Sequence, residues 1–330
     1  MHLVMQTVSN KLAFIEKIFG KGILAPNGKN FNVRCPICAP SDLNKRKLAI
    51  RVVDDAHHCW TCGWKAYSLA PLIRKYGTTS QLSQYKNEFA FNKRAAENKQ
   101  EIERPKVAPL PSDFKLLGSE SITDPDYKAA WNYLKNRQIS LRDAWHYKLG
   151  ISNDPRWKRR IIIPSFDGAG DLNFYVSRNI DSHDRRTKYD NPDDDKNQII
   201  FNEINLNWEK RIVICEGPFD MMKCGDNATC LLGSDLSQQS KLFSQILLHG
   251  TPVALALDGD MWNSKTPRLA KLFQGYDIDV TLVDTRSSGD PGSMTKQSFK
   301  NALLSASHPT WEGMFFDRLD KISQVRLHIN

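Results

Sequence analysis

The sequence lacks any long apolar run, and it also lacks the GxxxxGKS/T motif that cradles nucleotide phosphates in many ATPases. No stretch approaches the roughly 18 consecutive apolar residues that a membrane-spanning helix needs. The N-terminus has neither the apolar segment nor the cleavage site of a signal peptide. We therefore expect a cytoplasmic protein that makes no contact with a membrane.

A disulfide scaffold is also excluded, because seven cysteines are an odd number and 330 residues can form cores without cross-links. Hydrophobic residues make up 40% of the chain and aromatic residues 10%, which argues against disorder. At roughly 100–200 residues per domain, the length predicts two or three compact units. Lys and Arg number 46 against 37 Asp and Glu, a net charge of +9 that is compatible with a polyanionic partner without identifying one.

Four of the cysteines form two CxxC pairs, CPIC at 35–38 and CWTC at 59–62, with twenty residues between them. Each pair presents two thiolates to one ion, and two such pairs are typical of tetrahedral zinc. The pattern predicts one structural zinc held by Cys35, Cys38, Cys59 and Cys62. A second interpretation stays open, in which His57 or His58 replaces one cysteine.

Basic and aromatic residues accompany these cysteines, a combination that suits single-stranded nucleic acid through phosphate attraction and base stacking. The predicted DNA-binding residues of this segment are Lys45, Arg46, Lys47, Arg51 and Trp60. For Trp60, packing beneath the zinc site is an equal alternative. Trp64 is expected to belong to the core.

The first half of the chain reads as helices followed by a hairpin. A short amphipathic helix is expected over the first twenty residues and a second helical patch over 126–147. Strands at 160–164 and 172–176 are joined by DGAG at 167–170, which predicts a hairpin turn.

Residues 211–300 alternate short β-rich runs with helical stretches, which predicts βαβ units and a parallel sheet. The expected strands are 211–215, 228–232, 252–257 and 278–283, and the expected helices are 219–225, 236–248 and 268–276. In such sheets, functional residues gather beyond the carboxyl ends of the strands. Three acidic motifs stand there: EGPFD at 216–220, DGD at 258–260 and GDP at 289–291.

Carboxylates at that edge can converge on Mg²⁺, the hard cation used with phosphate substrates. We expect Asp258, Asp260 and Asp290 to bind metal, and Glu216 to act as a further ligand or as a general base. The alternative is that acidic residues after strands only cap helices and turns, a role that suits Asp220 and Asp235.

Together these motifs resemble the DNA primases of the bacterial DnaG type, in the shorter form found in phages. The resemblance covers most of residues 31–300. The cysteine segment looks like the zinc-binding domain of that family, and YLKNRQIS at 133–140 is similar to the segment that opens its core. The acidic motifs, with LGS at 232–234, look like a Toprim fold. Gly292 departs from the family, which often has a second acidic residue there.

A basic block, RIIIP at 160–164 with Arg178 and TKY at 187–189, resembles the half of the primase core that guides the template and holds nucleotides. The resemblance therefore implies nucleotide or template binding by Arg160, Arg178, Lys188 and Tyr189. It also implies catalytic roles for Glu216, Asp258, Asp260 and Asp290, with Mg²⁺ or Mn²⁺ in two or more copies.

The implied fold class is multidomain α/β: a zinc-ribbon-like β domain, then a primase core with a basic α+β subdomain and a parallel-sheet Toprim subdomain. The expected boundaries are a zinc-binding domain over 1–77, a flexible linker over 78–112, the basic subdomain over 113–208, the Toprim subdomain over 209–300 and a tail over 301–330. We expect the tail to be helical, with Trp311, Phe315, Phe316 and Leu319 facing either the core or a partner protein.

The resemblance implies RNA primer synthesis on a single-stranded DNA template from ribonucleoside triphosphates, in the bacterial host cytoplasm if a phage encodes the chain. Without a P-loop the chain is not expected to unwind DNA, so the implied partner is a separate replicative helicase. A topoisomerase is disfavoured, because it would need a nucleophilic tyrosine in a second large domain. A Toprim nuclease, and a non-catalytic protein that binds single-stranded DNA or recruits a helicase, remain as alternatives.

Overall fold

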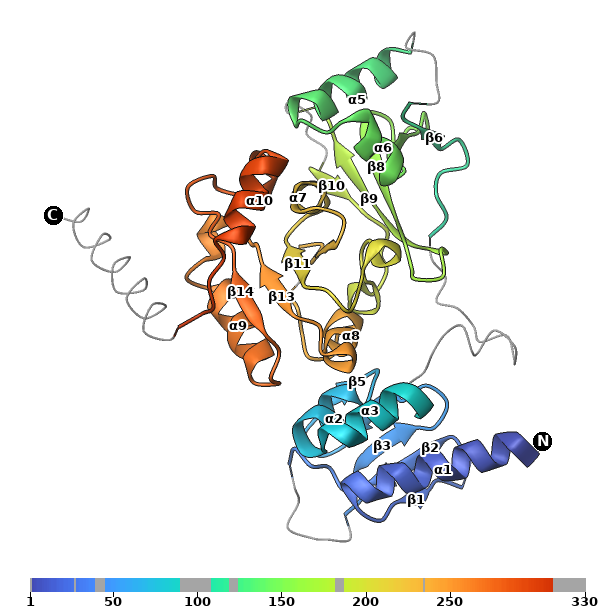
Figure 1. Cartoon of the computed structure of the whole chain (residues 1–330). Helices are drawn as coiled ribbons and strands as arrows, with labels where there is room; N and C mark the ends of the chain where they lie inside the picture. The colour runs from blue at the N-terminus through green and yellow to red at the C-terminus, as the bar shows by residue number, and fades with distance from the viewer. Residues whose placement is uncertain are drawn as a thin grey trace, which may run out of the picture. The chain divides into compact units, whose positions relative to one another are not determined.

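The computed structural model describes residues 2–26, 28–38, 45–89, 108–118, 124–181, 187–233 and 235–310. Two compact units make up the chain (Figure 1): residues 1–103 with 236–251, and residues 104–235 with 252–330. Antiparallel sheets, a parallel sheet and helices occur together, which confirms the predicted α/β class. In the part of the chain described, no helix is both long and apolar enough to cross a membrane. The expected tail after residue 310 lies outside the described residues.

The first unit is built on a five-stranded antiparallel sheet whose strands follow sequence order. These strands are β1 (Ile23–Leu24), β2 (Asn30–Val33), β3 (Leu48–Arg51), β4 (His57–Cys59) and β5 (Lys65–Ala66). Its helices are α1 (His2–Phe19), α2 (Ala70–Tyr76), α3 (Thr79–Gln84), the π-helical turn η1 (Tyr85–Phe89) and α8 (Lys241–His249). The predicted N-terminal helix is thus confirmed, and Ile15 and Phe19 on its apolar face are buried in the core.

The predicted linker begins later than expected. Residues 79–89 are helical, and Leu82 and Tyr85 are buried in the core of the first unit. Thr78 caps α3 through a reciprocal capping box with Gln81, which fixes the start of the helix. The polar composition of this segment reflects its exposed face, and the start of the predicted 78–112 linker is helical and packs in the core of the first unit. Residues 90–107 lie outside the described part of the chain.

A buried ion pair ties α1 to the sheet of the first unit. Lys11 Nζ lies 2.8 Å from Asp55 Oδ1 and donates to the Val52 carbonyl oxygen at 3.0 Å. The other oxygen of Asp55 accepts from the Tyr85 hydroxyl at 2.7 Å. Lys11 is 8% exposed and Asp55 is fully buried, so each charge depends on the other for its solvation.

The second unit contains an antiparallel sheet in the order β10-β9-β8-β7-β6. Its strands are β6 (Lys115–Leu116), β7 (Gly150–Ile151), β8 (Arg160–Phe166), β9 (Leu172–Asn179) and β10 (Tyr189–Asp190). The predicted hairpin is confirmed, since β8 pairs with β9 antiparallel across the turn at 167–170. The helical patch predicted over 126–147 is instead two helices, α5 (Pro125–Asn136) and α6 (Leu141–His146). Gln138, at φ 54°, breaks the helix, and Ser140 caps α6.

The same unit holds the predicted parallel sheet, in the order β12-β11-β13-β14. Its strands are β11 (Ile212–Cys215), β12 (Ala228–Cys230), β13 (Val253–Leu255) and β14 (Val280–Leu282). Its helices are α7 (Pro218–Cys224), α9 (Lys265–Gln274) and α10 (Lys296–Leu304), with the short turns η2 (Lys196–Gln198), η3 (Glu203–Asn205), η4 (Gly259–Met261) and η5 (Pro291–Ser293). Because all four strands run parallel, their carboxyl ends share one edge.

One hydrophobic core spans both sheets of the second unit. Ile163 and Phe174 from the antiparallel sheet belong to the same buried cluster as Val213 and Phe219 of the parallel-sheet region. The cluster also includes Leu134 of α5. The predicted basic subdomain and the predicted Toprim subdomain therefore share a core, and the turn after α5 is held against α7.

The buried pair in the first unit generates a stability prediction. Lys11→Ala removes the ammonium and leaves the Asp55 carboxylate buried without its counter-charge. We expect the free energy of unfolding to fall by about 3–5 kcal/mol. Lys17→Ala, at an exposed position of the same helix, should change it by less than about 0.5 kcal/mol. Urea unfolding followed by circular dichroism measures both, and equal midpoints for the two variants would contradict the role given to the pair.

Candidate functional site

The four predicted zinc ligands come together in the first unit. Cys35 Sγ lies 3.9 Å from Cys62 Sγ, and Cys38 Sγ lies 3.8 Å from Cys59 Sγ. All four sulfur atoms lie within 4.8 Å of one another. A tetrahedral zinc with Zn–S bonds of about 2.3 Å requires sulfur separations of about 3.8 Å. The cluster therefore fits one zinc ion, and the antiparallel sheet that carries it fits a zinc ribbon.

Crowding of four thiols also shows why a cation belongs here. Burial, with the neighbouring thiols, raises the pKa of Cys35 to about 12, whereas at Cys59 the effect of burial is outweighed by backbone N–H groups of Cys62 and Thr61 and the pKa falls to about 7. Zinc binds thiolates, and its charge removes the cost of gathering them. A fourth thiolate completes the shell, which leaves no open position for catalysis.

Neither histidine next to the second CxxC pair belongs to the group of potential metal ligands that the structure brings together. His57 Nδ1 lies 2.9 Å from the Asp55 carbonyl oxygen, and Trp64 Nε1 donates to His57 Nε2 at 3.3 Å. Burial lowers the pKa of His57 to about 4, which keeps the ring neutral. His58 packs edge-on against Trp60 with ring centroids 4.3 Å apart. The structure therefore gives no support to a histidine ligand.

The basic residues predicted to bind DNA in this unit differ in their availability. Lys45 and Lys47 are exposed, whereas Arg46 donates to the Lys21 carbonyl oxygen and Arg51 forms a two-bond ion pair with Asp54. Trp60 is 72% exposed, which favours a contact role over a core role. Trp64 packs against the core, as expected.

In the second unit, the predicted catalytic acids follow the carboxyl ends of the parallel strands. Glu216 comes directly after β11, Asp258 and Asp260 follow β13, and Asp290 caps η5 by accepting from the Ser293 N–H at 2.7 Å. Asp260 is exposed, while the other three are partly buried. Lys265, at the start of α9, lies 3.5 Å from Glu216 Oε1.

Asp258 is the most strongly perturbed of these acids. Burial raises its pKa to about 7, and the nearby carboxylates of Asp220, Glu216, Asp290 and Asp260 add to the shift. Its Oδ1 atom is buried and has no hydrogen-bond partner among the residues that the structure describes. A carboxylate oxygen without a partner, inside a group of like charges, is a position that a divalent cation would stabilise. The acids fit Mg²⁺ or Mn²⁺, although they are less closely gathered than the four thiols, the one group of described residues whose ligand atoms all lie within 4.8 Å.

Asp220 joins this group, although the sequence pointed only to a helix cap. One carboxylate oxygen accepts from the Gly217 N–H at 2.9 Å, as a cap would, and the other accepts from the Gly292 N–H at 3.1 Å. Burial, then the charge of Asp290, raises its pKa to about 6, against the effect of the two N–H groups and Arg137. The capping spacing of EGPFD concealed the second role. Asp235 does not cap a helix but forms an ion pair with Arg268 at 2.7 Å.

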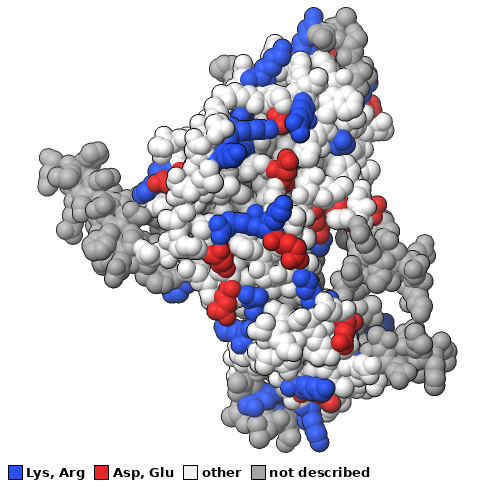
Figure 2. Space-filling view, in the orientation of Figure 1, with Lys and Arg blue, Asp and Glu red and all other residues white. Residues whose placement is uncertain are grey.

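The predicted nucleotide-binding and template-binding residues separate into two groups. Arg160 is 2% exposed and donates to the carbonyl oxygens of Ser177 and Thr187, so it holds β8 in place and does not face a ligand. Arg178 lies over the Tyr189 ring at 4.9 Å, and Lys188 is exposed. Basic side chains gather over the region of α7 and α10, with acidic ones beside them (Figure 2).

No protein-family model and no curated protein matches the chain. Its structural neighbours are DnaG-type primases. The zinc-binding and RNA polymerase domains of the Aquifex aeolicus primase align with 98% of this chain and 89% of that one, at 18% identity and a TM-score of 0.47. The E. coli primase catalytic core aligns with 60% of this chain and 79% of that one, at 18% identity and a TM-score of 0.48.

A third neighbour is a DnaG primase catalytic domain bound to single-stranded DNA, which covers 60% of this chain and 77% of that one at 16% identity and a TM-score of 0.48. None of these TM-scores reaches one half.

The cysteine cluster predicts a zinc content of one ion per chain. Cys38→Ser removes one of the four thiolates and should lower the bound zinc well below one equivalent, together with the melting temperature of the protein. Cys224→Ser changes a cysteine outside the cluster and should retain the zinc. Elemental analysis of the purified proteins measures both, and full zinc in Cys38→Ser would remove that thiol from the site.

The perturbed acids predict a pH-dependent stability that metal reverses. The pKa of Asp258 is about 7 in the folded protein against an ordinary value of 3.8, so its stabilising effect is present at low pH and lost as the pH rises through about 7. Because the loss accumulates between about pH 4 and pH 7, Asp258→Asn should raise the melting temperature by a few degrees at pH 8 without Mg²⁺, and by clearly less at pH 5. Added Mg²⁺ at pH 8 should stabilise the unmodified protein more than the variant.

Asp193→Asn serves as the matched control, because Asp193 is an exposed acid of the second unit that lies outside this group of carboxylates. It should leave the melting temperature unchanged at both pH values. An equal effect of Asp258→Asn at pH 5 and pH 8 would show that charge repulsion is not the cause.

Proposed function

We propose that this protein is a DNA primase, a nucleotidyltransferase that makes short RNA primers on single-stranded DNA. The observation that carries this proposal is the group of carboxylates at the carboxyl edge of the parallel sheet, where neighbouring carboxylates help raise the pKa of Asp258. We call this set the acidic group; its members are Glu216, Asp220, Asp258, Asp260 and Asp290. Such a group suits divalent cations that act on phosphate substrates. Arg178 and Lys188, which both lie over the Tyr189 ring, supply positive charge suited to a nucleic acid and to nucleotides.

In the proposed reaction, the 3′-hydroxyl oxygen of one ribonucleotide attacks the α-phosphorus of the next ribonucleoside triphosphate. The bond from that phosphorus to the β-phosphate oxygen breaks, and pyrophosphate leaves. The hydroxyl proton passes to Glu216 or, where Glu216 binds metal instead, to solvent water. Mg²⁺ or Mn²⁺ held by Asp258, Asp260 and Asp290 would stabilise negative charge on the attacking and leaving oxygens.

Asp220 acts on the arrangement of the site. Its two carboxylate oxygens receive the N–H groups of Gly217 and Gly292, which belong to the two loops that carry Glu216 and Asp290. This bridge keeps the two loops in a fixed relation. Positioning of this kind supplies much of the rate in phosphate chemistry, because the reaction needs aligned groups more than a reactive side chain.

Other features support a template partner. The exposed Trp60, Lys45 and Lys47 of the first unit suit base stacking and phosphate contact with single-stranded DNA. The RNA primer is the product that this reaction would release. A replicative helicase acting in trans, in the cytoplasm, is the partner that we propose for unwinding.

Primer synthesis tests the proposal. The protein incubated with single-stranded DNA, ribonucleoside triphosphates and Mg²⁺ should yield short RNA. Asp260→Asn should lower the yield of RNA by roughly 10²-fold, because it removes a ligand of the metal that would stabilise negative charge in the transition state. The affinity for DNA should stay within about twofold. Asp193→Asn, the exposed control, should retain synthesis.

Other outcomes would redirect the assignment. Undiminished synthesis in Asp260→Asn would remove that residue from the site. No RNA on any template, even with a helicase present, would favour a non-catalytic binding protein. Cleavage of the DNA by the unmodified protein, lost in Asp260→Asn, would favour a Toprim nuclease.

A further inference from the structure

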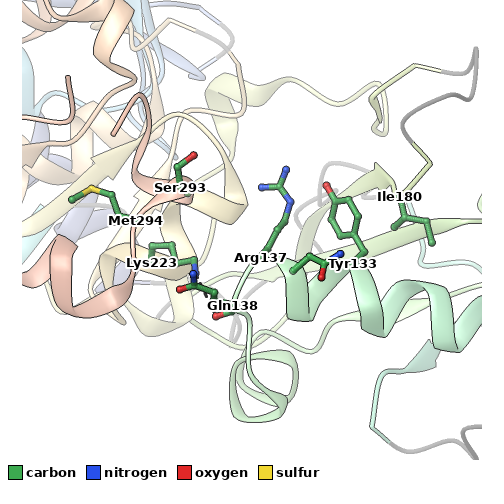
Figure 3. A pocket seen from close by; sticks show the side chains of 9 residues that line it. Tyr133, Arg137, Gln138, Ile180, Lys223, Ser293 and Met294 are labelled. Carbon is green, nitrogen blue, oxygen red and sulfur yellow. Dashed lines mark hydrogen bonds between the residues drawn. The ribbon is translucent and has the colours of Figure 1, made fainter. Parts of the chain in front are cut away.

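A cavity of about 440 Å³ lies in the second unit, between the turn after α5, helix α7 and the loop that carries η5 (Figure 3). Its lining includes Tyr133, Arg137, Gln138, Lys223, Gly292 and Ser293. Arg137 extends between Tyr133 and Ser293, and Lys223 lies beside Gln138. None of the functional residues predicted from the sequence lines this cavity.

Positive charge dominates the walls. Lys223 is 3% exposed, and its ammonium has one hydrogen bond in the part of the chain described, to the Gln138 carbonyl oxygen at 3.3 Å. An ammonium group has three N–H donors, so two remain for a ligand. Arg137 lies over the rings of Tyr133 and Phe219, at 5.1 and 4.9 Å, and has no ion pair among the described residues.

The surroundings of Lys223 do not neutralise this charge. Burial lowers its pKa, and the charges of Lys296 and Arg137 act in the same direction, opposed by Asp143. Asp143 is already engaged in an ion pair with Lys296. Two buried or half-buried cations therefore face one cavity without a carboxylate partner of their own, an arrangement that an anion would stabilise.

The Tyr133 hydroxyl points to the same conclusion. Its Oη atom is buried and has no hydrogen-bond partner among the described residues. A buried hydroxyl without a partner costs free energy, so proteins rarely keep one unless a ligand or water satisfies it. An anionic oxygen in the cavity would accept from this hydroxyl as well as from the two cations.

The cavity shares a wall with the acidic group. The Gly292 N–H donates to Asp220, and the Ser293 N–H donates to Asp290, while both residues also line the cavity. A Cβ atom at position 292 would lie 2.5 Å from Asp220 Oδ1, so glycine is what allows this close approach. An anion in the cavity would thus lie next to the site where the proposed reaction handles phosphates.

We propose that this cavity binds a diphosphate or triphosphate group, with Lys223, Arg137 and the Tyr133 hydroxyl as donors. The identification of its ligand as the phosphate chain of a ribonucleoside triphosphate, and as the pyrophosphate that leaves, rests on the proposed function. The anion site itself does not, because it follows from unneutralised charge and an unsatisfied hydroxyl. Lys223 is the residue that most directly indicates a ligand. Its one hydrogen bond among the described residues, to the Gln138 carbonyl oxygen, does not account for burying an ammonium group.

Pyrophosphate is the probe that tests the site, in calorimetric titrations of the zinc-loaded full chain without added Mg²⁺. Lys223→Met keeps the length and apolar stem of the side chain but removes the charge, and should weaken binding about tenfold or more. Tyr133→Phe removes only the unpartnered hydroxyl and should weaken binding about threefold without lowering the melting temperature. Lys223→Arg should restore most of the affinity.

Lys135→Met is the matched control, because it removes the same charge from an exposed position of α5 outside the cavity. It should leave affinity within about twofold. Equal losses in Lys135→Met and Lys223→Met would indicate general charge attraction and overturn the site. Absence of binding by the unmodified protein, or unchanged affinity in both Lys223→Met and Tyr133→Phe, would overturn it as well.

Kinetics then separate this inference from the proposed function. If the protein makes primers, Lys223→Met should raise KM for the ribonucleoside triphosphates more than it lowers kcat. Primer synthesis with an unchanged KM in that variant would overturn the cavity as a nucleotide site while leaving the primase proposal intact. Specific pyrophosphate binding without any primer synthesis would support the anion site and contradict the primase proposal.

Discussion

Repulsion among carboxylates held at one edge of the parallel sheet is the constraint on which the second unit depends. Strands β11 and β13 deliver Glu216 and Asp258 to the same edge, and the loop after β14 adds Asp290. The fold cannot relax this crowding without losing its strand order. Its effect is visible in Asp258, whose pKa rises to about 7, and in Asp220, whose pKa rises to about 6. The structure offsets part of the cost with backbone N–H groups, and a divalent cation would offset the rest.

Two cations of the same unit, Arg137 and Lys223, line the cavity on the other side of the loop that carries Asp290. The charge of Arg137 offsets a small part of the rise in the pKa of Asp220. Its guanidinium packs on aromatic faces instead of pairing with a carboxylate. This is possible because the antiparallel and parallel sheets share one core, which holds the turn after α5 against α7. The proximity of opposite charges without their neutralisation is the property that suits the unit to phosphate substrates.

The features that depend on spacing in the sequence were predictable, and those that depend on tertiary contact were not. Two CxxC pairs fix a zinc site because the ligands lie in short knuckles, and alternating β and helical runs fix a parallel sheet. Asp220 satisfied a local capping pattern, so nothing in the sequence pointed to its contact with Gly292. Arg160 was predicted to bind nucleotide or template from the family resemblance of its segment, yet it is buried and donates to two carbonyl oxygens that are 17 and 27 residues away in the sequence. Lys223 lies on the short helix α7, and in the sequence nothing distinguishes it from a surface charge; only the structure shows that it is buried and lines a cavity.

The backbone of η5 serves two sites at once, since Gly292 and Ser293 donate to the carboxylates of the acidic group and line the adjoining cavity. Any shift of η5 (Pro291–Ser293) would change the acidic group and the adjoining cavity together. Occupancy of one site would therefore alter the affinity of the other, by the same factor in both directions. A cation that draws Asp220 and Asp290 inward and an anion that settles against Ser293 would each prepare the loop for the other. Order of binding would then matter little, because either ligand could arrive first and lower the free-energy cost of the second.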